Sequence, residues 1–294
     1  MTVVHCLPFW FVMLSITLPA QKEEATFEWA KRTAKIGYES LPVGQHSLDE
    51  LKVGAPWRLG ASHDASTLQS AMPILVGDRW IAPGAYRITL LRQDATKCVV
   101  VADGSHSALG GGEAVQIPGA LGKTNKPAKR LAIELGKKGA AVAGNQPAQM
   151  VIRFGADEWR GDVLVLGNKT VSVTGGKLAV FTVPTTNLER GAVPIASLVL
   201  GKGVADAWNV VLDGDKVRLV PWMQAPKTLE APVMAPDSAG IVEGTVAPVE
   251  ATVTTEAEVL ELREAALAKG ELRLVVAFGA KVLECMLPEP KRGK

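Results

Sequence analysis

The residues of this chain that could hold a metal ion lie in two short polar stretches. His63 and Asp64 are adjacent, and His106 follows later, with His46 and Asp103 in the same part of the sequence. Imidazole and carboxylate groups are ligands for Zn²⁺ and similar divalent ions. The spacing matches no compact zinc motif, so exposed loop histidines are the alternative. His63, Asp64 and His106 are therefore a candidate divalent-metal or hydrolytic site.

Two other catalytic patterns are incomplete. Ser62 directly precedes His63 and Asp64, but adjacent side chains cannot turn toward one another as a catalytic triad requires. The Gly-Lys-Thr sequence at residues 122–124 ends like a phosphate-binding loop, yet Ile117 stands where that motif needs its first glycine. The sequence therefore predicts neither a serine hydrolase nor a nucleotide-binding loop.

Carboxylates and tryptophans offer two further kinds of site. Asp157 and Glu158 are adjacent, but acid–base chemistry needs a carboxyl group in an apolar pocket, and we expect this pair at a solvated turn. Tryptophan rings at strand edges can stack on sugars, which makes Trp159 and Trp208 candidates for a carbohydrate-binding module. Burial of both rings in a core is the alternative.

The charge balance excludes some partners. The 294 residues include 32 Lys and Arg against 30 Asp and Glu, a net charge of +2. Such a balance provides no broad basic surface for nucleic acid or for an anionic membrane. A local basic cluster at residues 123–130 is expected to be a solvated loop.

The N-terminus is typical of an export signal. Residues 1–20 contain no Lys, Arg, Asp or Glu, and their apolar run ends in Pro-Ala before a charged stretch. We expect cleavage after Ala20 and export to the periplasm or the cell exterior, and a retained anchor or a buried strand is the alternative. No later segment is apolar for long enough to span a bilayer. After export, Cys98 and Cys285 could form a disulfide, or both could be buried free thiols.

The recurrent elements are short strands. Apolar alternation bounded by Gly, Asp and Asn predicts a mostly β protein, an antiparallel β-sandwich or a barrel-like core. Similar sequences at residues 150–156 and 274–280 each predict a strand with an inward Phe and a Gly at a turn or bulge. Hairpins are expected from residues 86–91 with 98–102, residues 163–166 with 171–173, and residues 208–212 with 217–220.

The organisation predicted from these elements has three parts after the signal. A β-rich domain covers residues 21–222 and includes a glycine- and lysine-rich loop at residues 117–147, with one short strand candidate at residues 131–135. A proline- and alanine-rich linker follows at residues 223–253. Residues 254–294 are expected to form one helix, ending at Gly270, and a strand that dock on the β core.

One stretch resembles a known family. The sequence WRLGASHDAS, followed later by APGAY, is similar to the signature of domain-of-unknown-function family 2911, a group of exported bacterial β-rich proteins. The resemblance covers roughly residues 28–104, and Ser62 departs from the Asn usual in the family. The family implies no catalytic residues. The matching positions that could be structural or face a ligand are Trp57, Arg58, Gly60 and Tyr86.

Together these patterns favour a non-catalytic role. We expect an exported β-sandwich protein that binds or scaffolds an envelope component or a glycan, with no nucleic-acid partner and no membrane span after cleavage. A metal-dependent or hydrolytic enzyme at His63, Asp64 and His106 is one alternative. A carbohydrate-binding module is the other.

Overall fold

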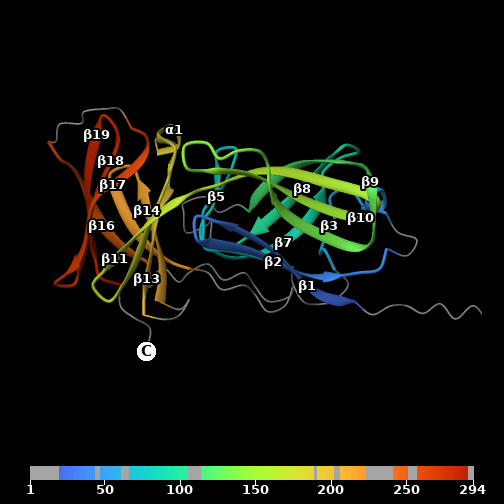
Figure 1. Cartoon of the computed structure of the whole chain (residues 1–294), viewed down its shortest axis with the longest axis horizontal. Coiled ribbons are helices and arrows are strands. Elements are labelled where there is room, and N and C mark those ends of the chain that lie inside the picture. Colours follow the sequence, from blue (N-terminus) through green and yellow to red (C-terminus); the bar gives the residue numbers. More distant parts are fainter. Residues whose placement is uncertain are drawn as a thin grey trace, which may run out of the picture.

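The chain folds into two antiparallel β units arranged along its long axis (Figure 1). The computed structural model describes residues 20–43, 47–60, 66–104, 114–188, 191–201, 206–222, 241–250 and 257–290. In these ranges the chain is mostly β, as the sequence predicted. No helix in the described ranges is long and apolar enough to cross a membrane.

The N-terminal unit is one sheet with the order β1-β2-β4-β7-β8-β9-β10-β5-β6, and β3 pairs with β7. Its elements are β1 (Gln21–Trp29), β2 (Arg32–Ser40), the 3-10 turn η1 (Leu48–Glu50), β3 (Pro56–Trp57), β4 (Thr67–Ser70), β5 (Ile74–Val76), β6 (Arg79–Ile81), β7 (Gly84–Arg92), β8 (Lys97–Asp103), β9 (Val115–Lys137) and β10 (Gln146–Val165).

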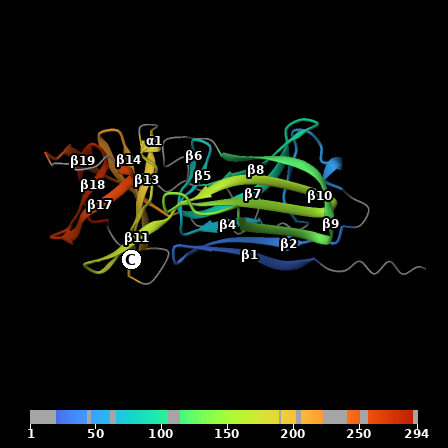
Figure 2. The ribbon, with the colours of Figure 1, turned by 45° about the horizontal axis from the view of Figure 1, so that its top comes forward.

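This sheet curls into a nearly closed barrel. The chain continues past β2, and Leu41 and Val43 bond to the backbone of the C-terminal half of β9. The amide of Leu131 donates to the Leu41 carbonyl at 2.7 Å, and the amide of Val43 donates to the Lys129 carbonyl at 3.1 Å. Figure 2 shows β9 and β10 running side by side along this unit. The inward side chains, among them Ile36, form one hydrophobic core.

The C-terminal unit is a second sheet with the order β11-β12-β13-β14-β15-β16-β19-β18-β17. Its elements are β11 (Asn168–Val173), β12 (Gly176–Phe181), α1 (Thr185–Leu188), β13 (Val193–Leu200), β14 (Ala207–Asp213), β15 (Lys216–Pro221), β16 (Val242–Pro248), β17 (Ala257–Ala268), β18 (Glu271–Gly279) and β19 (Lys281–Pro288). β17 returns toward the start of the sheet, where the Leu260 amide donates to the Val183 carbonyl at 2.8 Å.

The two units share buried contacts. Leu75 and Trp80, which pair across β5 and β6, are buried in the core of the C-terminal unit. The side-chain amide of Asn209 on β14 donates to the Pro83 carbonyl at 2.8 Å. Trp80 therefore has a structural role at the junction of the units.

The predicted C-terminal helix is wrong. Residues 257–268 form strand β17, and Lys269 and Gly270 make the two-residue turn to β18, both with positive φ. The Ala, Glu and Leu in this segment have good helix propensity. That preference is weak, however, and pairing with β18 outweighs it. Gly270 therefore closes a hairpin rather than ending a helix.

The predicted loop at residues 117–147 is also wrong in its larger part. β9 covers Val115–Lys137 without interruption, because Ile117, Leu131 and Ile133 point into the core while the lysines between them face water. The loop expectation rested on Gly and Lys content, which does not exclude a strand with one solvated face.

The hairpin predictions had mixed outcomes. β7 pairs with β8, and β14 pairs with β15 around a turn at Gly214 and Asp215, so these two hairpins are confirmed. The third expected hairpin is wrong: β10 and β11 belong to different sheets, and Gly167 lies at the crossing between the two units. Gly167 has no room for a side chain, because a Cβ there would lie 2.1 Å from the Gly144 carbonyl oxygen.

Candidate functional site

A pocket of about 370 Å³ lies at one end of the barrel. A cavity of this size can hold a small organic molecule, and mostly apolar walls with a few polar groups are typical of binding pockets. The lining comes from four separate segments of the chain. The residues that line this barrel-end pocket are Leu41, Pro42, Ser47, Leu48, Glu50, Leu51, Trp57 and Phe154.

Two aromatic rings form one wall of the pocket. Trp57 lies on β3 and Phe154 on β10, and their ring centroids are 5.5 Å apart with the planes tilted by 53°. Phe154 is buried in the core of the barrel, whereas Trp57 is only half-buried. An aromatic pair in this tilted arrangement is favourable, and both rings add apolar surface to the lining of the pocket.

An irregularity in the pairing of β9 with β10 lies beside the pocket and directs the side chains on either side of it. The pairing with β9 skips from Gly155 opposite Ala128 to Asp157 opposite Lys123, so β9 carries extra residues at this point. Gly155 has φ of +65°, and a Cβ there would lie 3.1 Å from Cγ1 of Val43. Bulges commonly re-aim side chains next to functional sites. Here the bulge lies between Phe154, on the pocket wall, and the buried carboxylate of Asp157.

Asp157 anchors the turn that forms another wall of the pocket. Its side chain is 2 % exposed, and Oδ2 accepts a hydrogen bond from the Leu48 amide at 2.8 Å. The ammonium group of Lys123 bonds the other carboxylate oxygen of Asp157 and also Asp49 Oδ2 at 2.7 Å. These hydrogen bonds to Asp157 and Asp49 raise the pKa of Lys123. The prediction of a solvated Asp157 is therefore wrong, because β9 and the η1 turn cover it.

Arg92 holds the same turn from its other end. Its guanidinium group donates to the backbone carbonyls of Asp49 and Leu51, the latter at 3.4 Å. It also donates to the carbonyls of Asp94 at 3.0 Å and Ala95 at 3.1 Å. The planar guanidinium suits such multiple contacts. Between Arg92 and Asp157, the pocket wall at residues 47–51 is fixed to two different strands of the barrel.

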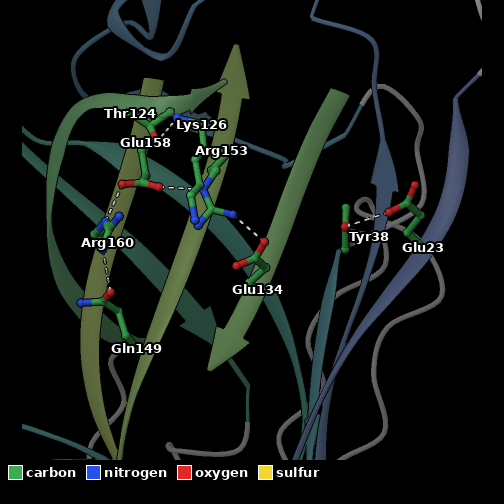
Figure 3. A network of polar contacts seen from close by, with 9 residues as sticks. All are labelled: Glu23, Tyr38, Thr124, Lys126, Glu134, Gln149, Arg153, Glu158 and Arg160. Carbon is green, nitrogen blue, oxygen red and sulfur yellow. Dashed lines mark hydrogen bonds and ion pairs between the residues drawn. The ribbon is translucent and has the colours of Figure 1, made fainter. Parts of the chain in front are cut away.

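Glu158 belongs to an ion-pair network on the outer face of β9 and β10 (Figure 3). Its carboxylate accepts from Arg153 Nε at 2.7 Å and from Arg160 Nε. Arg153 also bonds Glu134, and Arg160 bonds Gln149 at 3.3 Å. Burial opposes ionisation of Glu158, but the hydrogen bonds from Arg160 and Arg153 outweigh it and lower its pKa. The carboxylate is thus kept charged, as a structural ion-pair partner rather than a general acid.

The four family-like residues have different surroundings. Tyr86 is fully buried, and its hydroxyl donates to the Ala82 carbonyl at 2.6 Å. Arg58 is exposed. Gly60 lies close to β2, because a Cβ there would be 3.1 Å from Glu39 Cβ. Only Trp57 among the four lines the pocket.

The two cysteines are unbridged. Cys98 is buried in the core of the N-terminal unit and Cys285 in that of the C-terminal unit, and both are free thiols. Of the two alternatives the sequence left open, the structure has the free thiols, because the two residues belong to separate cores. Burial raises the pKa of Cys98 to about 11 and that of Cys285 to about 12.

The two tryptophans considered for sugar stacking are core residues. Trp159 is 0 % exposed, and its indole nitrogen donates to the Cys98 carbonyl at 2.9 Å. Trp208 is 5 % exposed and lies in the core of the C-terminal unit. Neither ring presents a face to a glycan, so the prediction of a carbohydrate site at these two residues is wrong.

The predicted metal ligands His63, Asp64 and His106, together with His46, lie outside the described residues. In the described ranges, no three His, Cys, Asp or Glu side chains form a group that could hold a metal. β4 follows residues 61–65 in the chain, and β8 precedes residues 105–113. Both strands pair with β7, where Arg87 lies opposite Thr67 of β4 and opposite Asp103 of β8. The divalent-metal site therefore stays a prediction.

The sequence did not identify the pocket residues as a set. Two signals concerned single residues: Trp57, predicted as a position that could be structural or face a ligand, and the Phe-Gly pair at residues 154–155, predicted as an inward Phe with a Gly at a turn or bulge. The prediction for the similar sequence at residues 274–280 is confirmed as well, because Phe278 is buried and Gly279 lies at the turn to β19. Nothing in the local sequence pointed to Arg92 or Asp157 as supports of a pocket wall.

In comparisons with known proteins, no family model, no curated protein and no solved structure matches this chain. The resemblance to domain-of-unknown-function family 2911 therefore has no support beyond the residues that suggested it, and it stays a prediction.

Proposed function

We propose that this protein is a non-catalytic binding protein that holds a small apolar molecule in the barrel-end pocket. The observation that carries the proposal is the tilted pair of Trp57 and Phe154 on the wall of a cavity of about 370 Å³. Apolar surface removed from water by a ligand there would contribute roughly 25 cal/mol per Å².

The way the pocket is built supports binding rather than simple incomplete packing. A buried carboxylate, an ammonium group and a guanidinium group all hold the wall at residues 47–51. Burying the Asp157 charge is costly unless it is paired. The hydrogen bonds that pair this carboxylate also hold the wall at residues 47–51 in one position. A wall fixed before the ligand arrives lowers the entropy cost of binding.

We place this activity outside the cytoplasm, at the cell envelope, with an envelope component as the source of the ligand. The apolar N-terminal residues support export, and β1 begins at Gln21, directly after the expected cleavage point. The near-neutral charge of the chain also favours a small apolar ligand over a polyanionic partner.

The test is titration with N-phenyl-1-naphthylamine, a neutral probe whose fluorescence rises in apolar surroundings. The mature protein is expected to bind it, and Leu51→Glu is expected to weaken binding roughly tenfold or more, because it puts a carboxylate in the apolar lining. Val53→Glu adds the same charge two residues away at a side chain that is 60 % exposed, and it should bind as the wild type does. Absence of binding by the wild type, or equal loss in both variants, would refute the proposal.

A further inference from the structure

We propose that Leu48 and Phe154 close the inner end of the barrel-end pocket, and that Phe154 sets the longest apolar chain the pocket can hold. The inference rests on the proposed function and names its ligand class: short, compact apolar molecules rather than long acyl chains. Among the lining residues that the structure describes, Leu48 is 1 % exposed and Phe154 is 6 % exposed. The other described lining residues are half-buried or exposed.

The inner end of the pocket is continuous with the core of the barrel. Leu48 and Phe154 both belong to that hydrophobic core, whereas Leu41, Leu51 and Trp57 pack against it and are only half-buried. The cavity therefore leads from a partly exposed rim to two buried side chains. Because protein cores are as densely packed as organic crystals, a chain that reaches Phe154 can go no further unless core side chains move.

Contacts with neighbouring residues fix both side chains of the inner end. Asp157 follows Phe154 on β10, and its carboxylate accepts a hydrogen bond from the Leu48 amide at 2.8 Å. The turn that carries Leu48 is thus bonded to the strand that carries Phe154. The Phe154 ring also packs against Trp57, with the ring centroids 5.5 Å apart. An inner end held in this way gives the pocket a fixed depth.

The experiment uses the neutral, unbranched 1-alkanols from 1-hexanol to 1-dodecanol. Displacement of N-phenyl-1-naphthylamine from the full mature chain gives the affinity of each alcohol. Each methylene group that enters the pocket is expected to raise the affinity about fourfold. In the wild type this gain should stop before 1-dodecanol, because a cavity of about 370 Å³ with a closed inner end leaves the rest of a longer chain in water. The measured quantity is the chain length at which the affinity stops rising.

Two variants test whether Phe154 sets this limit. Phe154→Ala removes the ring from the inner end, and the limit is expected to move to chains longer by roughly two methylene groups or more. Phe154→Leu is a milder change that should move the limit by about one methylene group, and it replaces Phe154→Ala if that variant does not fold. Because the limit is a chain length, a uniform loss of affinity in either variant does not alter it.

The matched control is the same pair of substitutions at Phe278. This side chain is buried in the core of the C-terminal unit, so its truncation should leave the limit at the wild-type chain length.

A wild-type affinity that keeps rising through 1-dodecanol would overturn this inference and leave the proposed function standing. A limit unchanged in the folded Phe154 variants, or an equal change in the Phe278 variants, would have the same consequence. Binding of N-phenyl-1-naphthylamine without displacement by any of the alcohols would overturn the inference as well. Failure of the wild type to bind N-phenyl-1-naphthylamine would refute the proposed function, and this inference with it.

Discussion

Adding one methyl group at Gly155 tests whether the bulge beside the pocket requires glycine. Gly155 has φ of +65°, a conformation that costs an L-residue about 1–2 kcal/mol. The new Cβ would also lie 3.1 Å from Cγ1 of Val43, so that side chain must shift slightly. We expect Gly155→Ala to lower the free energy of unfolding by about 2 kcal/mol, the sum of backbone strain and this contact.

Two other glycines separate these contributions. Gly139 has φ of +79° and open space around it, so Gly139→Ala reports backbone strain alone, about 1 kcal/mol. Gly136 lies in β9 without a positive φ and with open space, and Gly136→Ala should change stability by less than about 0.5 kcal/mol. In Gly155→Ala, a second change of Val43→Ala should restore the part of the loss that comes from the contact.

The assay is urea unfolding at constant pH, with the free energy obtained by linear extrapolation for each variant. Because the bulge lies between Phe154 and Asp157, Gly155→Ala should also weaken binding of N-phenyl-1-naphthylamine, whereas Gly136→Ala should not. A Gly155→Ala protein as stable as the wild type, with unchanged probe affinity, would refute this account of the bulge.

Asp157→Ala is expected to expose the Leu48 amide to hydrogen exchange at least about tenfold faster, since its buried acceptor is removed, while Asp157→Asn should retain much of the protection. Asp162→Ala is the matched control, and equal Leu48 exchange in Asp157→Ala and wild type would contradict the anchoring role. Because the folded pKa values of Cys98 and Cys285 are raised above the ordinary 9.0, to about 11 and about 12, their contribution to stability is complete below pH 9. That contribution should be lost between pH 9 and about 11 for Cys98, and between pH 9 and about 12 for Cys285, by about 1.4 kcal/mol per pH unit for each thiol. In urea unfolding, the free energy of unfolding of the Cys98→Ala, Cys285→Ala double variant should therefore depend less steeply on pH than that of the wild type. An identical slope in that variant would show that the thiols are not the cause.

Strand patterns in the sequence predicted the strand-rich class because buried and exposed residues alternate over short stretches. β7 shows this alternation from Tyr86 to Leu91, and the hairpin of β7 with β8 is predicted correctly. β17 was misassigned because its Ala, Glu and Leu residues suit a helix, and only pairing with β18 makes it a strand. β9 is not predicted by its sequence as a strand over its whole length, because its solvated lysines and its glycines are typical of a loop.

The pocket could not be predicted because it has no local signature. Its walls come from residues after β2, from the η1 turn, from β3 and from the middle of β10. These segments meet only when the continuation of β2 bonds to β9 and closes the barrel. Asp157 looked like a turn residue because adjacent acidic residues are usually solvated, whereas the bulge turns it toward the Leu48 amide.

The most direct test of the account is a titration of the isotopically labelled mature protein with N-phenyl-1-naphthylamine, followed by ¹H–¹⁵N spectra. The indole signal of Trp57, assigned with Trp57→Phe, and the backbone amides of Leu51 and Phe154 are expected to shift on binding. The indole signals of Trp80 and Trp208, buried in the other core, should stay in place. Shifts confined to Trp80, Trp208 or other sites, with Trp57 unmoved, would contradict the claim that the barrel-end pocket is the binding site.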